Sequence, residues 1–319
     1  MRTPDTPHDE QARLATLRSL NILDTLPEER FDRLTRLAKR LFGVPIAVVS
    51  LVDENRQWFK SSAGLSASET PRDISFCGHA ILGDDIFIVP DAIADERFAD
   101  NPLVVNDPHI RFYAGCPLRA PNGHKVGMLC IIDRQPKSFG NNELEAMIDL
   151  AAMAEQEIAA VQLATLDELT SISNRRGFMM LARHSLDLCA RQKLSASLVF
   201  MDLDNLKRIN DTFGHAEGDR ALTVFAERLK ATSRDADVFA RLGGDEFVGL
   251  LINASRQNAE RVVSRFHHSV EKYNQEAKRG YDISFSHGIV GFDTEKHRTI
   301  DALLADGDSL MYELKRSKR

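Results

Sequence analysis

The sequence lacks the features that mark membrane-spanning, exported and nucleic-acid-binding proteins. It has no run approaching the roughly 20 consecutive apolar residues that a membrane-spanning helix needs. Its first ten residues, MRTPDTPHDE, contain no apolar signal region, so we expect a cytoplasmic protein. Acidic residues outnumber basic ones by 47 to 41, and the net charge of −6 argues against binding along a nucleic-acid backbone. We therefore expect neither a membrane nor a nucleic acid as a partner.

Cysteine is scarce as well, with four residues among 319. They form no Cys-x-x-Cys pair and no cluster of the kind that holds structural zinc: Cys77, Cys116, Cys130 and Cys189. We interpret all four as buried thiols in a reducing compartment. With 43% hydrophobic and 28% charged residues, a chain of this length can form two globular domains, each with its own core.

The first half of the chain combines a helical pattern with paired strand patterns. Apolar residues recur at helical spacing between Pro27 and Gly43, where the pattern ends. Four β-rich runs form two hairpin patterns: Ile46–Val52 with Gln57–Gly64, and Phe112–Ala120 with Lys125–Asp133. These patterns predict an antiparallel sheet backed by helices over residues 10–139, after a flexible tail at residues 1–9.

Residues 10–139 resemble a GAF domain. The resemblance rests on four segments: NILDTLPEERFDR, VSLVDENRQWFKSSAGL, ETPRDISFCGHAI and CPLRAPNGHKVGMLCIID. GAF domains are sensory modules that bind small molecules or dimerise. The resemblance therefore implies a sensor domain with a small-molecule ligand, whose identity it does not give.

A helical segment separates the two halves. Asn142 and Glu145 have capping-box spacing in the stretch NNELEAMIDLAAMAEQEIAAVQLATLDE, and we predict a helical linker over residues 141–166. One heptad frame places six apolar residues on a single seam: Leu144, Met147, Ala151, Ala154, Ile158 and Val161. This seam favours a parallel two-helix coiled coil between two copies of the chain. Because its alanines make the seam weak, a helix packed on its own domain is the alternative.

The second half, residues 167–319, alternates helix and strand patterns, which predicts an α/β (α+β) domain with a central mixed sheet surrounded by helices. The run Ala196–Asp204 has the pattern of a strand that ends in acids. Two further apolar runs, Val238–Leu242 and Phe247–Ile252, lie on either side of Gly243, Gly244, Asp245 and Glu246. Because glycine accepts positive φ, we predict a hairpin turn at Gly243 and Gly244.

This turn and the preceding strand bring acids together. Asp202 lies at the strand end, and Asp245 and Glu246 follow the glycines. Such hard oxygen ligands suit Mg²⁺, which is typically held by one or two carboxylates, by waters and by substrate phosphates. The backbone amides from Leu203 to Leu206 approach a helix N-terminus, where phosphate oxygens bind, and Lys207 adds a positive charge. We predict a metal-dependent site for a nucleoside triphosphate.

Residues 166–319 resemble a GGDEF-type diguanylate cyclase domain. The matching motifs are DELTSISNRRGF, DLDNLKRINDTFGHAEGD, RLGGDEF, SFSHGIV and DSLMYELK. The resemblance implies condensation of two GTP into cyclic di-GMP and two diphosphates, with two Mg²⁺ per active site and Mn²⁺ as the alternative metal. Since each domain presents one nucleotide, it also implies a homodimer that the GAF domain and the linker regulate.

Carried over to matching positions, the resemblance assigns the metal to Asp202, Asp245, Glu246 and the carbonyl of Leu203. Glu246 is expected to bind metal or to assist deprotonation of the ribose 3′-hydroxyl. Together with Asp245 and Lys207, it makes up the expected catalytic set.

The same resemblance assigns residues to the substrate. They are Lys207 and Lys315 at the phosphates, Arg241 close to them, Leu203 and Leu206 beside the nucleotide, and Asn210 and Asp219 at the base. Leu206 stands where the family commonly has phenylalanine. An ionised Asp219 accepts two hydrogen bonds that guanine can donate and adenine cannot, so we expect GTP rather than ATP.

Arg234 and Asp237 have the Arg-x-x-Asp spacing at which the family binds its product, cyclic di-GMP, as an inhibitor. Arginine suits bidentate phosphate recognition, whereas a surface ion pair is the alternative interpretation. For the whole chain, the alternative to an active cyclase is a receptor that binds GTP or cyclic di-GMP without turnover. Such receptors usually lose the glycines or acids that this chain retains.

Overall fold

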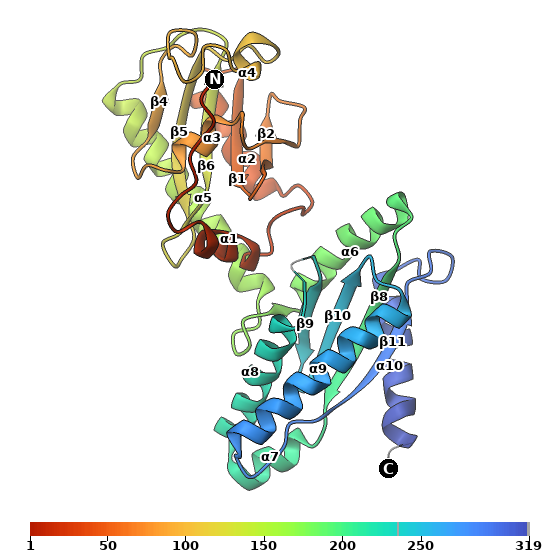
Figure 1. Cartoon of the computed structure of the whole chain (residues 1–319). Helices are drawn as coiled ribbons and strands as arrows, with labels where there is room; N and C mark the ends of the chain where they lie inside the picture. The colour runs from red at the N-terminus through yellow and green to blue at the C-terminus, as the bar shows by residue number, and fades with distance from the viewer. Residues whose placement is uncertain (235, 318–319) are drawn as a thin grey trace. The chain divides into compact units, whose positions relative to one another are not determined.

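The chain divides into two units, Met1–Gln162 and Leu163–Arg319, and the computed structural model describes residues 1–234 and 236–317 of it (Figure 1). Each unit contains its own sheet, with hydrophobic cores on both faces of that sheet. Within the described residues, no helix combines the length and the apolar character needed to cross a membrane.

The sheet of the first unit has six strands in the order β3-β2-β1-β6-β5-β4, and each neighbouring pair is antiparallel. The strands are β1 (Ile46–Val52), β2 (Arg56–Ala63), β3 (Glu69–Pro71), β4 (Phe87–Val89), β5 (Phe112–Arg119) and β6 (Lys125–Asp133). Every residue of β1 is buried, because its alternating side chains enter the cores on the two faces. The predicted antiparallel sheet is confirmed.

Helices cover both faces of this sheet. Those on one face are α1 (Glu10–Ser19), α2 (Glu29–Leu41) and α5 (Asn141–Thr165), and the short helices on the other are α3 (Phe76–Ala80) and α4 (Pro102–Val105). In α2, the buried residues Phe31, Leu34 and Ala38 recur at the spacing of one helix face.

The seam predicted for a coiled coil is buried inside the first unit. Five of its six residues are at most 4% exposed and belong to the core between α5 and the sheet: Met147, Ala151, Ala154, Ile158 and Val161. Leu144, the sixth, is half-buried. The helix thus packs on its own domain, within the unit that ends at Gln162. The coiled-coil prediction was wrong for this seam, because periodicity identifies an apolar face without identifying what covers it.

Residues 1–9, which we predicted as a flexible tail, are hydrogen-bonded through Arg2 to other parts of the first unit. The amide of Arg2 donates to the carbonyl of Arg97 at 3.2 Å. The carbonyl of Arg2 lies 2.9 Å from Nε2 of His79, at hydrogen-bonding distance.

An ion-pair cluster holds α1 on the sheet. The guanidinium of Arg13, which is 1% exposed, donates to both carboxylate oxygens of Glu10 at 2.8 Å and to the carbonyl of Val52 at 2.7 Å. Arg72 donates to Glu10 as well, at 2.5 Å. Burial opposes the ionisation of Glu10, but the two guanidinium groups outweigh it and lower the pKa of Glu10 to about 2.

The sheet of the second unit has the order β11-β8-β10-β9-β7. Its strands are β7 (Ser173–Asn174), β8 (Ala196–Leu203), β9 (Val238–Gly243), β10 (Glu246–Ile252) and β11 (Phe285–Gly291). The β7–β9 pair is parallel and the other pairs are antiparallel, so the predicted mixed sheet is confirmed.

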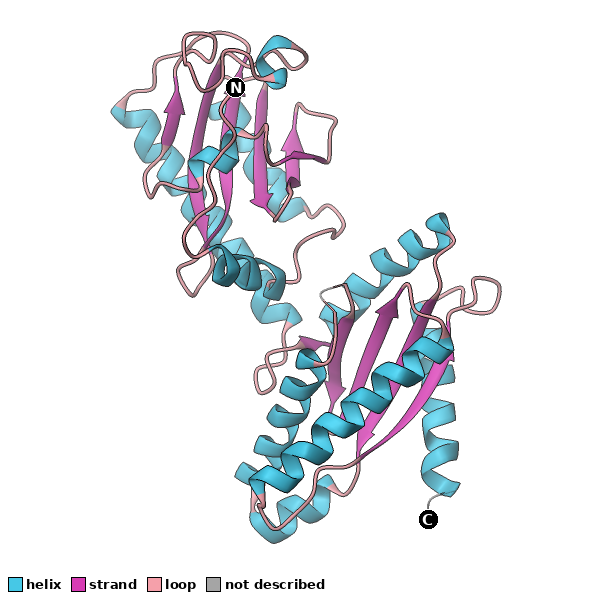
Figure 2. Ribbon diagram, in the orientation of Figure 1, coloured by secondary structure: helices cyan, strands magenta, loops and turns pink. Residues whose placement is uncertain are grey.

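Helices enclose this sheet as well (Figure 2). Those on one face are α8 (His215–Ala231) and α9 (Arg256–Ala277), those on the other are α6 (Arg175–Gln192) and α10 (Ile300–Ser317), and the short α7 (Leu206–Phe213) follows β8. Four phenylalanines pack between the sheet, α8 and α9, with ring centroids 4.7–5.2 Å apart: Phe225, Phe247, Phe266 and Phe285. This aromatic layer fixes the strands whose ends carry the candidate site.

Candidate active site

Three adjacent strands of the second sheet, β10, β8 and β11, carry polar residues at paired positions. Because β8 lies between β10 and β11, Asp202 pairs with Glu246 on one side and with Ser286 on the other. Directly paired residues of antiparallel strands point to the same face of a sheet. The register therefore brings the carboxylates of Asp202 and Glu246 side by side, on the face that α6 and α10 cover.

The β9–β10 hairpin reverses through Gly244 and Asp245. Gly243 has a φ of 150° and Gly244 a φ of 54°, both in the region that favours glycine. A Cβ added at either position would meet no atom within 4 Å, so the glycines are needed for backbone conformation and not for space. The amide of Leu203 donates to the carbonyl of Asp245 at 3.0 Å. This bond ties the turn to the end of β8.

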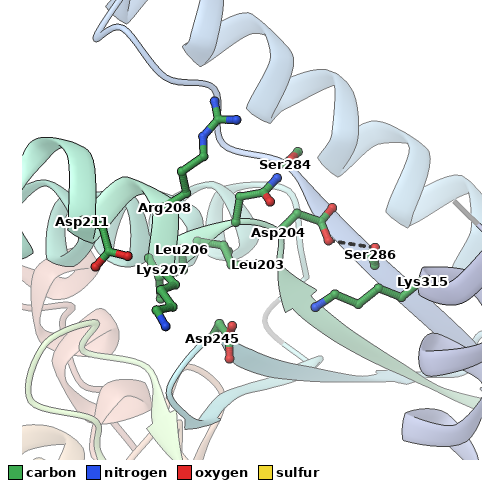
Figure 3. Close-up of a pocket in the computed structure, with 11 residues that line it drawn as sticks. Leu203, Asp204, Leu206, Lys207, Arg208, Asp211, Asp245, Ser284, Ser286 and Lys315 are labelled. Atoms are coloured by element: carbon green, nitrogen blue, oxygen red, sulfur yellow. Dashed lines mark hydrogen bonds between the residues drawn. The ribbon is translucent and has the colours of Figure 1, made fainter. Parts of the chain in front are cut away.

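A cavity of about 580 Å³ opens beside the turn (Figure 3). Five of the residues predicted for the site line it: Leu203, Leu206, Lys207, Asp245 and Lys315. The other lining residues are Asp204, Asn205, Arg208, Asp211, Ser284 and Ser286. The side chains of Lys207 and Lys315 both extend towards the region around Asp245, whereas Arg208 points away from it (Figure 3). The volume lies within the range of small-molecule sites.

The carboxylates at this edge of the sheet perturb one another. Burial raises the pKa of Asp202 against the opposing hydrogen bond from Lys315, whose Nζ lies 2.5 Å from Oδ1, and the charge of Asp245 adds to the rise. Burial also raises the pKa of Glu246, and Asp308 and Asp245 raise it further. Negative charge concentrated in this way favours a cation.

The donor set fits a divalent cation that the substrate helps to bind. Asp202 and Asp245 supply carboxylates beside the end of β8, where the Lys315 ammonium already neutralises Asp202. Among the described residues, no group of three or more acidic, histidine or cysteine side chains could hold a metal ion by itself. Mg²⁺ typically takes one or two carboxylates and completes its shell with waters and phosphates. The sparse set therefore agrees with a metal that arrives with a nucleotide.

Asn210 and Asp219, predicted to read the base, do not line the cavity. Asn210 is half-buried on α7, and Asp219 is exposed near the start of α8. Asn210 lies against Gly218, the residue before Asp219. A Cβ added to Gly218 would lie 1.8 Å from Oδ1 of Asn210. The absence of a side chain at Gly218 thus lets the Asn210 amide lie against the backbone next to Asp219.

Arg241, predicted close to the phosphates, faces the turn instead of the cavity. Its guanidinium donates to the carbonyl of Gly244 through Nε at 3.0 Å and through a terminal nitrogen at 2.9 Å. The other terminal nitrogen lies 3.2 Å from Oδ1 of Asp167. Arg241 therefore links the first residues of the second unit to the glycine turn.

Arg234 and Asp237 do not form the surface ion pair that we considered as an alternative. The carboxylate of Asp237 accepts the backbone amides of Arg234 and Ile252, both at 3.1 Å, while the Arg234 side chain is exposed. Asp235, between them in the sequence, lies outside the described residues. Asp237 thus closes the loop before β9 and leaves the guanidinium of Arg234 towards solvent.

Sequence reasoning overlooked Asp204 and the two serines beside it. Ser286 Oγ donates to the Asp204 carboxylate at 2.9 Å, and the Asp204 amide donates to the carbonyl of Ser284 at 2.8 Å. The alternating acids at the end of β8 were a usable signal for Asp204. The serines belong to the SFSHGIV motif, but their role beside Asp204 could not be assigned, because it depends on the pairing of β11 with β8.

The same contacts occupy two of the four amides, Leu203 to Leu206, that we predicted to face a phosphate. The first two amides of this run already donate to Asp245 and Ser284. The following residue, Asn205, has a φ of 61° and forms no side-chain cap on α7. The amides of this run that remain for a phosphate are those of Asn205, at the N-cap, and Leu206, the first residue of α7.

Two family models match the chain. Residues 26–158 match the GAF domain, and residues 164–319 match the family described as diguanylate cyclase, GGDEF domain. A cyclic di-GMP phosphodiesterase of Pseudomonas aeruginosa is 32% identical over 270 residues, which are 83% of this chain and 45% of that protein. Diguanylate cyclase A of Treponema denticola is 30% identical over 214 residues, 64% of this chain and 57% of that protein. The chain thus spans about half the length of these two relatives.

Further similarities cover one or both domains. The diguanylate cyclase DgcP of Escherichia coli is 28% identical over 269 residues, 77% of this chain and 75% of that protein. A solved GGDEF domain from Pseudomonas aeruginosa is 35% identical and aligns with 48% of this chain and 89% of its own, with a TM-score of 0.43. The solved coiled coil and GGDEF domain of DgcB from Caulobacter crescentus, in complex with c-di-GMP, is 21% identical and covers 55% and 93% of the two chains, with a TM-score of 0.48.

Proposed function

Because the chain belongs to the GGDEF family and carries a GAF domain ahead of its GGDEF domain, we propose that it is a diguanylate cyclase. It joins two GTP molecules into cyclic di-GMP and releases two diphosphates. The observation that carries this proposal is the cavity lined by Asp245, Lys207 and Lys315, at the sheet edge where Asp202 and Glu246 are paired. More than half of the phosphodiesterase relative lies outside the match, so its activity is not carried over to this chain.

The cavity residues divide the binding of one GTP between them. Lys207 and Lys315 neutralise the β- and γ-phosphates, and the first amides of α7 donate to phosphate oxygens. Lys315, which bonds to Asp202 in this structure, transfers its hydrogen bond to the nucleotide. Asp202, Asp245 and the carbonyl of Leu203 would hold Mg²⁺, or Mn²⁺ in its place. When bound, two such ions stabilise the attacking and leaving oxygens of the displacement.

Proton transfer falls to Glu246, unless that carboxylate serves as a further metal ligand. The 3′-hydroxyl oxygen of one GTP forms a bond to the α-phosphorus of the other, and the bond from that phosphorus to the diphosphate oxygen breaks. Glu246 accepts the hydroxyl proton, a role that its raised pKa suits. Since one domain presents one nucleotide, two domains must meet in a homodimer, which turns an encounter of two substrates into a positioned reaction.

Selection of guanine rests on Asn210 and Asp219. The Asp219 carboxylate accepts from N1–H and the 2-amino group of guanine, and the Asn210 amide adds a further hydrogen bond. Adenine would leave the carboxylate without these donors, which makes ATP a poor substrate.

Control of the reaction is assigned to two other parts of the chain. The GAF domain, through a small-molecule ligand and through α5, regulates how the two GGDEF domains of a dimer align. Cyclic di-GMP inhibits the enzyme by binding to Arg234, whose exposed guanidinium suits a phosphate. Asp237 stabilises the loop that carries Arg234. We place this activity in the cytoplasm.

Incubation of the full chain with GTP and Mg²⁺ tests the proposal, with diphosphate release and cyclic di-GMP measured separately. Wild type should form both, and Asp245→Ala should form neither. Asp187→Ala, which removes an exposed carboxylate from α6, is the matched control and should retain activity. A verified dimer that binds GTP or cyclic di-GMP but releases no diphosphate would identify a non-catalytic receptor instead.

A further inference from the structure

The first unit contains a second cavity, of about 150 Å³, with two thiols in its wall. Its lining includes Cys77 on α3 and Cys130 on β6, which are 2% and 0% exposed. It also includes Ser66, Ala67 and Asp107, which are exposed. The cavity therefore leads from the surface to the buried thiols. It is several times larger than the roughly 30 Å³ that a water molecule occupies in the liquid.

The two thiols lie in contact with each other and with one hydroxyl. Their Sγ atoms are 3.3 Å apart, and Oη of Tyr113 lies 3.3 Å from Cys77 Sγ and 3.2 Å from Cys130 Sγ. Gly115 makes this position of the hydroxyl possible, because a Cβ there would lie 2.3 Å from Oη. Three elements of the fold thus converge on a single sulfur pair.

The two sulfurs differ in their tendency to ionise. Burial opposes ionisation of Cys77, but hydrogen bonds from Cys130 and Tyr113 outweigh burial and lower the pKa of the Cys77 thiol. Burial raises the pKa of Cys130, and the neighbouring Cys77 raises it further. Since the thiolate is the reactive form of cysteine, the hydrogen bond that Tyr113 Oη donates to Cys77 Sγ at 3.3 Å, together with these directions, favours Cys77 as the nucleophile of the pair.

We propose that Cys77 and Cys130 form a reversible intramolecular disulfide when hydrogen peroxide or a small organic peroxide enters this cavity. The Cys77 thiolate attacks the peroxide, takes one oxygen as a sulfenic acid and releases water or an alcohol after protonation. The Cys130 sulfur then attacks the Cys77 sulfur, the S–S bond forms as the S–O bond breaks, and the oxygen takes the Cys130 proton and leaves as water. Two thiols lose two electrons, which reduce the O–O bond.

The contact geometry favours this reaction over a metal site. Formation of the bond requires the sulfurs to close from 3.3 Å to about 2.05 Å, a movement on the scale of a small side-chain rotation. Among the described residues, no third histidine, cysteine or carboxylate joins the pair in a group that could hold a metal. The disulfide would tie α3 to β6 at the cavity wall, and cellular thiols would reduce it again.

The test follows the covalent state of the full chain, so it is independent of the proposed cyclase activity. Reduced protein is exposed to stoichiometric hydrogen peroxide, denatured with an alkylating reagent and analysed by mass spectrometry. We expect alkyl groups on Cys116 and Cys189 alone, a cross-linked peptide pair containing Cys77 and Cys130 that is about 2 Da lighter than the two free-thiol peptides together, and full reversal by dithiothreitol. Cys77→Ser and Cys130→Ser should each abolish the cross-link, and Cys116→Ser and Cys189→Ser should retain it.

The wild-type protein alone can overturn the proposal. The proposal fails if both cysteines remain alkylated under these conditions, if Cys77 is converted to sulfinic acid while Cys130 stays reduced, or if the cross-link involves Cys116 or Cys189. Tyr113→Phe tests the positioning role of the hydroxyl. It should slow disulfide formation at least about threefold, because the Cys77 thiolate loses a hydrogen-bond donor. An unchanged rate would remove Tyr113 from the argument.

Discussion

Gly218 should control guanine binding through Asn210, although it has no side chain with which to contact a nucleotide. An alanine Cβ at this position would lie 1.8 Å from Oδ1 and 2.8 Å from Cγ of Asn210. Gly218 lies within α8, where alanine is favoured over glycine by about 1 kcal/mol. The clash falls on the end of a flexible side chain. We therefore expect Asn210 to rotate away in Gly218→Ala while the fold is preserved.

The size of the effect follows from the loss of one hydrogen bond. Such a bond contributes about 0.5–1.5 kcal/mol net, which corresponds to a rise in the KM for GTP of about 2- to 13-fold. The melting temperature should change little, because the gain in helix propensity offsets the repacking of Asn210.

Steady-state diphosphate release from Gly218→Ala, Asn210→Ala and the double variant forms a double-mutant cycle. If Gly218→Ala acts only by displacing the amide, the double variant should have the KM of Asn210→Ala alone, so the two effects should be strongly non-additive. Glu227→Ala, on the exposed surface of the same helix, is the control and should leave the KM unchanged. Additive effects, or an unchanged KM in folded Gly218→Ala, would refute the reasoning.

Three further predictions concern contacts outside the cavity. Arg241→Lys keeps the charge but loses the paired hydrogen bonds to Gly244, so kcat at saturating GTP should fall about tenfold; an unchanged kcat would show that the turn needs no anchor. Arg234→Ala should raise the cyclic di-GMP concentration for half-inhibition about tenfold or more, and an unchanged inhibition curve would move the product site elsewhere. Glu10→Gln should lower the free energy of unfolding of the first unit by about 1–3 kcal/mol near neutral pH, because buried Arg13 loses its carboxylate partner. Since the pKa of Glu10 falls from 4.5 to about 2 on folding, wild type should lose this contribution as the pH drops from 4.5 towards 2. Urea unfolding near pH 7 and near pH 3 measures the difference between the two proteins, which should shrink in acid; a constant difference would contradict the assignment.

The parts of the second domain that sequence could predict are those fixed by local chemistry. Two adjacent glycines between apolar runs indicate a turn with positive φ, and the structure has φ values of 150° and 54° there. An acid at the end of an apolar strand indicates a carboxylate at a sheet edge, which is where Asp202 lies. The partners of Arg241 could not be predicted in this way, because a guanidinium can donate equally to a phosphate or to a carbonyl. Its partners, Gly244 and Asp167, became visible only in the folded chain.

Contacts between distant segments were beyond local pattern reading. Cys77 and Cys130 are separated by 53 residues, and their contact depends on how α3 packs against β6. Neither cysteine belongs to a spacing motif that would have paired them. The hydroxyl of Tyr113 adds a third element that the sequence could not place.

The α5 seam shows a further limit, and its packing decides which surfaces remain for a second copy of the chain. A coiled coil through Met147, Ile158 and Val161 would require α5 to leave its sheet and expose side chains that are at most 4% exposed. Burial of such a side chain contributes roughly 1.5–3 kcal/mol, so these three alone contribute about 5–9 kcal/mol. A seam rich in alanine offers less apolar contact than it would give up.

The homodimer that the proposed reaction requires must therefore use other surfaces while α5 stays on its sheet. Both α2 and α5 cover the same face of that sheet, and their outer surfaces carry large apolar side chains that are 43–55% exposed: Leu37, Leu41, Ile148 and Met153. A second copy that covers these residues gains apolar burial without giving up the core beneath α5. Dimerisation through these outer faces would leave the buried seam intact, with α5 still packed on its sheet.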